Sequence, residues 1–279
     1  MRLSKEKIYS DNFDKAQYDA YIIGSDTVWS TDESGGFDDG FWANYPVMRG
    51  KLCIAYSPSA ADMDFSESDK QTIKNRLKNF SAVSMRESRH IGLFSSLANR
   101  EISNTLDPTL LLDRPDYEAL IDGKRIFKEK YLLYYARKRH VKMYKFIDEL
   151  AKKLNLRVVE INKDCLRLFK VKNVYCSSIE DFLRLIRDAS VVVTDSFHGT
   201  IFSMIFERDF YSYKRQCCSS KIEHLCACAG LSNRIVCDGA DADKAIAEGL
   251  KIDYAKVRKN LEPRREFSKS YLKKALGLV

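Results

Sequence analysis

One histidine of this sequence stands at the point where a buried strand gives way to a helix. Residues 191–193, V-V-V, form an unbroken β-branched run, which is typical of a strand covered on both faces of a parallel sheet. The short polar residues 194–196 then turn the chain and can cap a helix, whose apolar residues recur at helical spacing after Thr200. An imidazole has an unperturbed pKa of about 6.5, so His198 at this junction could give or take a proton near neutral pH.

The same junction has the features of an anion site. Open α/β sheets bind ligands at the carboxyl ends of their parallel strands, where the next helix directs N–H groups and its positive dipole end at the ligand. Gly199 would let a ligand approach the backbone, and the hydroxyls of Ser196 and Thr200 would add donors. A phosphate or a carboxylate would fit. The alternative is that His198 only caps the helix and forms hydrogen bonds inside the core.

The length and composition describe a globular protein of one large domain or two ordinary ones. The chain has 279 residues, of which 45% are hydrophobic and 31% charged. Its apolar runs are far shorter than a membrane span, and no apolar signal core follows the charged N-terminus. We therefore expect a cytoplasmic protein without an integral membrane segment.

The net charge of +8 arises from 47 basic and 39 acidic residues, so both signs are dense and mixed. No stacking motif or basic block with interleaved aromatic residues accompanies it, so we expect no nucleic-acid partner. The excess favours anionic ligands. Peripheral contact with an anionic membrane surface is compatible with this charge, but no amphipathic anchor supports it.

The cysteines raise the question of a metal site. Five of the eight cysteines and one histidine crowd one region: Cys217, Cys218, Cys226, Cys228, Cys237 and His224. No C-x-x-C spacing occurs, and cysteines that are adjacent or alternate in a helix point away from each other. One helical stripe instead connects Ile222, Leu225, Cys226 and Ala229. We expect a core helix here and no metal.

Short strands alternate with helices in the first half of the chain, and a polar turn follows each strand. Strands are expected over 18–23, 51–56, 82–85 and 101–106, and helices over 66–79 and 90–97. Ser66 and Asp69 have the spacing of a capping box. This alternation predicts a parallel sheet, so the turns at Ser25, at Arg86 and after Leu106 should share one edge.

A second α/β domain is expected after a charged stretch that starts with a proline, residues 114–130. Strands are expected over 131–135, 156–161, 191–193 and 209–213, and helices over 142–153, 179–189 and 253–276. Lys214 and Arg215 follow the last of these strands. We place the N-terminal domain at 1–120 and the C-terminal domain at 121–252, with the helix of 253–279 packing back on the first domain.

Six segments in order resemble the polysaccharide pyruvyl transferase family. They are Y-D-A-Y-I-I-G-S-D-T-V-W (18–29), S-M-R-E-S (84–88), D-P-T-L-L-L (107–112), T-D-S-F-H-G-T-I-F-S (194–203), S-K-I-E-H-L (220–225) and G-L-S-N-R (230–234). The resemblance covers about residues 18 to 235. It implies a GT-B-like fold, in which two Rossmann-like domains face each other across a cleft. It also implies transfer of a pyruvyl group from phosphoenolpyruvate onto a sugar as a cyclic ketal.

By position, His198 matches the histidine of the family motif, and Arg86 matches its basic residue after the third strand. Relatives can carry arginine where this chain has Ser196, so Lys214, Arg215 or Lys221 would have to replace that charge. Family members commonly carry a further glycine-rich β/α segment before the G-S-D strand. Only about 17 residues precede that strand here, so the resemblance implies a shortened N-terminal domain.

Phosphoenolpyruvate carries a phosphate and a carboxylate, which call for a bidentate cation and a backbone anion cradle. Arg86 and the helix start at Gly199 are candidates, with Ser25 and Asp26 at the same expected edge as Arg86. The alternative for Arg86 is an ion pair with Glu87 or a neighbouring carboxylate. We expect catalysis by His198, no cofactor beyond the donor substrate, and a sugar or lipid-linked saccharide as acceptor.

Two other functions fit the same residues. A GT-B-type glycosyltransferase that uses a nucleotide-sugar would share the basic residues, but it usually needs a carboxylate near a helix start for the ribose. Glu207 is the available candidate. A non-catalytic relative that binds a sugar or a protein is the other alternative.

Overall fold

The computed structural model describes residues 9–138, 141–161, 172–174, 178–214 and 219–278. The chain divides into two compact units. Unit 1 consists of Met1–Leu111 and Pro263–Val279, and unit 2 of Leu112–Glu262. The boundary predicted from the sequence lies after residue 120. Each unit contains one parallel sheet, so the expected α/β class with two separate sheets is confirmed.

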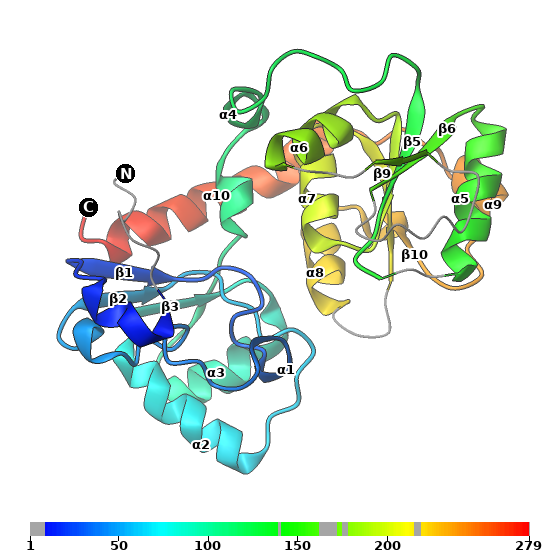
Figure 1. The fold of residues 1–279 in the computed structure, drawn as a ribbon. Helices are drawn as coiled ribbons and strands as arrows, with labels where there is room; N and C mark the ends of the chain where they lie inside the picture. The colour runs from blue at the N-terminus through cyan, green and yellow to red at the C-terminus, as the bar shows by residue number, and fades with distance from the viewer. Residues whose placement is uncertain (1–8, 139–140, 162–171, 175–177, 215–218, 279) are drawn as a thin grey trace. The chain divides into compact units, whose positions relative to one another are not determined.

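Unit 1 is built on a four-stranded sheet in the order β1-β2-β3-β4 (Figure 1). Its strands are β1 (Ala20–Ile23), β2 (Leu52–Ala55), β3 (Ala82–Met85) and β4 (Ser103–Asn104). All neighbours are parallel, with Ile54 of β2 opposite Ile22 on one side and Ala82 on the other. The carboxyl ends of the four strands therefore lie at one edge of the sheet, as the sequence predicted.

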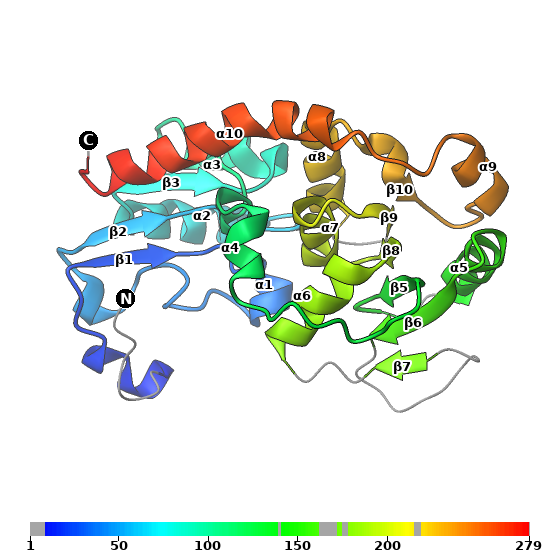
Figure 2. The same ribbon diagram turned by 90° about the horizontal axis from the view of Figure 1, so that it is seen from above.

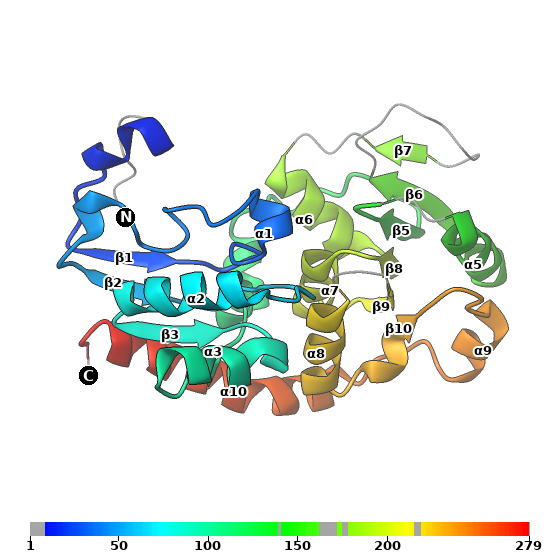
Figure 3. The same ribbon diagram turned by 90° about the horizontal axis from the view of Figure 1, so that it is seen from below.

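Helices cover both faces of this sheet. Helices α2 (Glu67–Arg76) and α3 (Ile91–Ala98) lie on one face, and the C-terminal part of α10 (Tyr254–Ala275) lies on the other (Figures 1 and 3). The shorter helical segments of unit 1 are α1 (Thr31–Ser34), η1 (Ser10–Lys15), η2 (Pro46–Met48), η3 (Leu77–Asn79), η4 (Ser88–His90) and η5 (Pro108–Leu111). The capping box at Ser66 and Asp69 is confirmed, because each residue's side chain accepts the other's backbone N–H.

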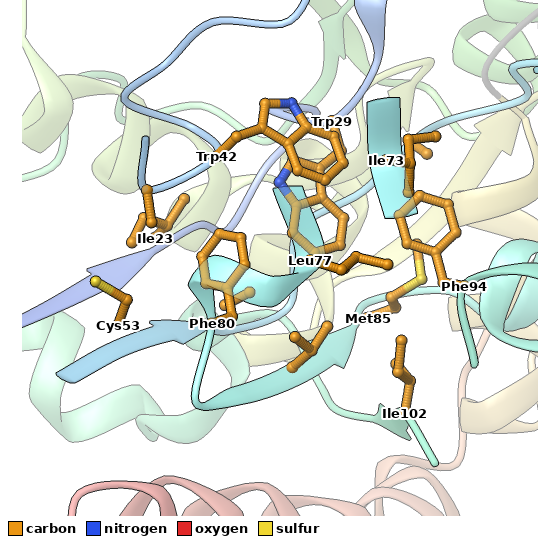
Figure 4. Close-up of a cluster of buried hydrophobic side chains, with 14 of the residues drawn as sticks. Ile23, Trp29, Trp42, Cys53, Ile73, Leu77, Phe80, Met85, Phe94 and Ile102 are labelled. Carbon is orange, nitrogen blue, oxygen red and sulfur yellow. The ribbon is translucent and has the colours of Figure 1, made fainter. Parts of the chain in front are cut away.

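Aromatic side chains fill the core of unit 1 (Figure 4). The rings of Trp29 and Trp42 stack with centroids 4.6 Å apart, and Phe94 stacks on Trp29 at 5.3 Å. The indole N–H of Trp29 donates to the carbonyl oxygen of Phe41 at 2.9 Å. This bond ties the loop after α1 to the core, because a buried indole N–H needs an acceptor.

Unit 2 is built on a six-stranded parallel sheet in the order β10-β9-β8-β5-β6-β7. Its strands are β5 (Tyr131–Tyr135), β6 (Arg157–Ile161), β7 (Lys172–Val174), β8 (Val191–Thr194), β9 (Asp209–Tyr213) and β10 (Ile235–Val236). Counted from β5 along the chain, the order across the sheet is third, second, first, fourth, fifth, sixth, which is the order of the Rossmann fold. The order reverses between β5 and β8, and ligands bind at this switch point in such sheets.

Two helical layers enclose the second sheet (Figure 2). Helix α7 (Phe197–Ile205) contacts both α6 (Ile179–Asp188) and α8 (Ser220–Ala229) on one face, and α5 (Val141–Lys153) contacts α9 (Ala242–Ala247) on the other. The remaining helical segments of unit 2 are α4 (Arg114–Glu118) and η6 (Ser232–Arg234). All four residues of β8 are buried, which confirms that its β-branched run is a strand covered on both faces. Among the described residues, none of the helices combines the length and apolar character that a membrane crossing requires.

Candidate functional site

The switch point of unit 2 brings two loops together. Strands β5 and β8 are neighbours, and the loops that follow them are joined through the buried carboxylate of Asp195. This carboxylate accepts the backbone N–H of Arg137 at 2.6 Å and that of Lys138 at 3.3 Å. The side chains of Arg137 and Lys138 are exposed at this edge. A buried anion therefore holds the backbone of a basic loop beside the start of α7.

His198 lies in the first turn of that helix. Ser196 is the N-cap, and its hydroxyl oxygen accepts the N–H of Gly199 at 3.2 Å. The imidazole of His198 is half-buried and lies edge-to-face with the ring of Phe197, with centroids 5.5 Å apart. The predicted strand-to-helix junction with a histidine at the carboxyl edge is present, and the positive end of the helix dipole lies at this turn.

Gly199 and Thr200, which the sequence predicts to bind the ligand, also have contacts inside unit 2, and their part in binding stays a prediction. A Cβ atom on Gly199 would lie 2.4 Å from Oγ1 of Thr194, so the glycine is required for α7 to pack on the end of β8. The hydroxyl of Thr200 donates to the carbonyl of Ser196 and lies 2.6 Å from the hydroxyl oxygen of Ser212. Both residues are buried. Their groups serve packing and hydrogen bonding inside unit 2.

The two described lysines of the predicted site lie in different surroundings. Lys214 follows β9, is exposed and forms an ion pair with Glu223 at 2.5 Å. Lys221 is buried in the first turn of α8. Arg215 lies outside the described residues. Their part in binding a donor stays a prediction.

In unit 1, Arg86 is surrounded by carboxylates. Its side chain is 2% exposed, and Nη1 lies 2.9 Å from Oδ2 of Asp107 and 3.6 Å from Oδ1 of Asp26. Its Nε lies 3.6 Å from a carboxylate oxygen of Glu87. The ion pair that the sequence left open as an alternative is thus present. Three carboxylates around one guanidinium give this edge a net negative charge. An anionic ligand would be repelled there.

Ser25 and Asp26 lie at the same edge, at the end of β1. The hydroxyl of Ser25 donates to the carbonyl of Ser57 at 2.6 Å and lies 3.2 Å from Asp107. The side chain of Asp26 is 63% exposed. Unit 1 therefore presents hydroxyl and carboxylate groups at this edge, and such groups bind the hydroxyls of a neutral ligand.

Among the described residues of the chain, no group of three His, Cys, Asp or Glu side chains is placed to hold a metal ion. The stripe predicted for α8 is confirmed, because Ile222, Leu225, Cys226 and Ala229 are all buried. Burial raises the pKa of the Cys226 thiol to about 12. Cys217 and Cys218 lie outside the described residues.

Sequence reasoning missed Arg137 and Lys138. A signal was available, because the basic run R-K-R-H (137–140) follows the predicted strand of residues 131–135 after a single alanine. Residues 139–140 lie outside the described part. The local pattern does not show that β5 lies beside β8, so it could not place this basic run next to the helix of His198.

A match to a family model shows the protein family to which the chain belongs. The family model described as polysaccharide pyruvyl transferase matches residues 1–214, more than half of the chain. This chain belongs to the polysaccharide pyruvyl transferase family. The matched range includes the carboxyl edge of the sheet in unit 1 and the switch point of unit 2. The comparison with curated proteins found no match.

Solved structures similar to this pyruvyl transferase family member show its fold. A complex of MnaA with UDP from S. aureus aligns with a TM-score of 0.59 at 11% identity, covering 96% of this chain and 78% of that chain. A UDP-N-acetylglucosamine 2-epimerase from Rickettsia bellii aligns with a TM-score of 0.54 at 11% identity, covering 96% and 76%. The UDP-GlcNAc 2-epimerase from Neisseria meningitidis aligns with a TM-score of 0.54 at 12% identity, covering 96% of this chain and 78% of that chain. These likenesses support the GT-B-like pair of Rossmann-like domains.

Proposed function

We propose that this protein transfers the pyruvyl group of phosphoenolpyruvate onto a saccharide as a cyclic ketal. Family membership supports the reaction class. The observation that carries the assignment to residues is the switch point of unit 2, where Asp195 holds the loop of Arg137 and Lys138 beside the helix turn of His198. This is the position at which a Rossmann sheet binds its ligand.

The donor carries a phosphate and a carboxylate, and unit 2 offers positive potential at its edge. The exposed cations of Arg137 and Lys138 and the start of α7 would bind these anionic groups. A guanidinium can bind a carboxylate or phosphate through two parallel hydrogen bonds. We therefore assign the donor to unit 2, with Lys214 as a further cation once it leaves Glu223.

His198 is assigned to proton transfer. A proton added to the methylene carbon of phosphoenolpyruvate makes the methyl group and leaves an oxocarbenium-like centre at C2. Two hydroxyls of the saccharide add to C2 as the C–O bond to phosphate breaks. Of the two hydroxyl protons, one balances the proton added to carbon and the other leaves with inorganic phosphate. The reaction is redox-neutral, and we propose that it uses no cofactor.

We assign the acceptor to unit 1. Its edge exposes the carboxylate of Asp26, and the hydroxyl of Ser25 lies beside Asp107, so both can take part in hydrogen bonds with sugar hydroxyls. Arg86 would hold this edge together through Asp107. The acceptor is a sugar or a lipid-linked saccharide. We place the reaction in the cytoplasm, where phosphoenolpyruvate is formed.

The glycosyltransferase alternative depended on Glu207. This residue follows the C-terminal end of α7, far from that helix's start in sequence, and its carboxylate forms an ion pair with Arg258. It is therefore not at a helix N-terminus, where a ribose would be bound. Glu207 therefore does not support the glycosyltransferase alternative.

The test is a donor comparison. The purified protein is incubated with a saccharide mixture and either phosphoenolpyruvate or a panel of UDP-sugars, and released phosphate and acceptor mass are measured. We expect phosphate release that depends on both phosphoenolpyruvate and saccharide, with a pyruvyl ketal on the product. Glycosyl transfer from a UDP-sugar, or no turnover with either donor, would contradict the proposal.

A further inference from the structure

Unit 1 contains a recess of about 680 Å³ along the edge strand β1. This volume lies within the range of about 300–1,000 Å³ that is usual for small-molecule sites. Figure 3 shows β1 as the outermost strand of the first sheet, with the dark blue η1 beyond it. One end of the recess is formed by Gly24 and Ser25, so it begins at the edge to which the acceptor was assigned.

Aromatic rings dominate the described lining. Six of them contribute to it: Tyr9, Phe13, Tyr18, Tyr21, Phe41 and Tyr45. Tyr18 is 47% exposed and Phe41 37%, and with Tyr9 they are three of the four exposed large aromatic side chains among the described residues. An aromatic ring left exposed in a recess keeps a large apolar face available for a ligand.

The recess is also preformed by contacts of its own. The rings of Phe13 and Tyr45 stack at 4.3 Å, and the hydroxyl of Tyr21 donates to the carbonyl of Ala16 at 2.5 Å. These contacts connect η1 to β1 and to the chain before β2. A site whose walls are already fixed loses less conformational entropy when it binds a ligand.

The charged and polar groups of the lining indicate which class of ligand fits the recess. Among its described residues there is no lysine or arginine, and the carboxylate is that of Asp38. An anion such as a phosphate is therefore disfavoured. Four tyrosines combine ring faces with hydroxyl groups, and Ser25 adds another hydroxyl. A hydrocarbon chain would not use these polar groups, whereas a neutral sugar ring has both apolar C–H faces and hydroxyls.

We propose that this recess binds a neutral sugar ring of a saccharide chain. In the proposed reaction, on which this part of the inference rests, that ring is next to the sugar that receives the pyruvyl group. The recess then sets which saccharides are accepted. Binding at the recess does not itself depend on turnover.

Fluorescence of the two tryptophans of the chain can report ligand binding in the recess. Trp29 donates to the carbonyl of Phe41, and Trp42 follows Phe41 in the chain. A ligand that contacts Phe41 should therefore change the tryptophan emission. A microarray of neutral and acidic glycans identifies a bound glycan, and fluorescence titration of that glycan gives its Kd.

We expect Tyr18→Ala and Phe41→Ala each to weaken binding of that glycan about 10-fold or more, because both rings are solvent-accessible in the recess. Phe267→Ala is the matched control: Phe267 is 50% exposed on α10 in the same unit but does not line the recess. Both test variants should keep the melting temperature of the wild type. In turnover assays they should raise KM for the saccharide and leave KM for phosphoenolpyruvate unchanged.

Three results would overturn the inference. One is a wild-type protein that binds no neutral glycan on the array, and another is binding that both variants retain. The third is tight binding to phosphatidylcholine vesicles that Tyr18→Ala removes, which would make a lipid the occupant. Glycan binding that the variants weaken, without any pyruvyl transfer, would support the recess and refute the proposed reaction, so the two failures are distinguishable.

Discussion

His198 is the residue on which the proposed chemistry depends most. We expect His198→Gln to lower turnover by about 10²–10⁴-fold while binding of phosphoenolpyruvate stays nearly intact. The physical reason is that Arg137, Lys138 and the start of α7 still attract the donor's anionic groups. Single-turnover phosphate release at saturating donor and saccharide measures this directly.

Other outcomes for His198 have defined meanings. A variant with full rate at saturation and a raised donor KM would show an anion ligand and would refute the acid–base role. A variant with a lowered melting temperature and unchanged kinetic constants would show a residue that only stabilises the fold.

Asp195 is a positioning residue in this scheme, since it is buried and contacts backbone of the basic loop. Asp195→Ala leaves the backbone N–H groups of Arg137 and Lys138 without this acceptor, so the basic loop should lose its fixed position. We expect the donor KM to rise about 10-fold and kcat to change less. Asp195→Asn keeps one acceptor oxygen and should recover part of the loss. Equal donor KM values in all three proteins would contradict this role.

Arg86 should contribute to stability more than its place at a ligand edge suggests. Arg86→Ala would leave the buried carboxylate of Asp107 without its cation, and breaking a buried pair in this way costs about 3–5 kcal/mol. The double variant Arg86→Met with Asp107→Leu removes both charges and should be more stable than Arg86→Ala. Urea unfolding of the wild type, Arg86→Met, Asp107→Leu and the double variant tests the coupling. Additive effects of the two single changes would show that the pair contributes little.

At the scale of elements, the contact between β8 and α7 is the tightest part of the candidate site. We expect Gly199→Ala to destabilise unit 2 by about 1–3 kcal/mol, because its Cβ would overlap the side chain of Thr194. Gly92 provides the control, since it lies within α3 and has no atom within 4 Å of the same added carbon. Gly92→Ala should stabilise the protein by up to about 1 kcal/mol. Similar melting temperatures for the two variants would contradict this difference.

Local sequence patterns were sufficient to predict the elements whose own residues show a clear periodicity or capping motif. The V-V-V run of β8, the capping box of α2 and the apolar stripe of α8 were predicted and are present. Strands β7 and β10 were not predicted, because three and two residues are too few to show a period. The short helix α9 was missed for the same reason.

The candidate site shows the same limit. The position of His198 at a strand-to-helix junction follows from neighbouring residues, so the sequence was sufficient to predict it. The role of Gly199 in packing and the link from Asp195 to the loop of Arg137 depend on which strands pair. Pairing of β5 with β8 joins segments about 60 residues apart, and periodicity does not report such contacts.

At the scale of the whole molecule, unit 1 is built from both ends of the chain. The buried hydroxyl of Ser268 accepts the N–H of Leu106 at 3.0 Å, and the guanidinium of Arg265 donates to the carbonyl of Leu110 at 2.8 Å. We expect deletion of residues 263–279 to unfold unit 1 and to leave unit 2 folded. Hydrogen exchange of the shortened chain should show protection in β5 and β8 and none in β2 and β3. Protection in both sheets would contradict this expectation.

This discontinuity has a consequence for how the protein is made. The ribosome releases the chain from its N-terminus, so β1 to β4 emerge first but wait for the last residues before one face of their sheet can be covered. Unit 2 is contiguous and can complete its fold earlier. The nascent first sheet is thus exposed until residues 263–279 have emerged, and the cell's chaperones should bind there until then.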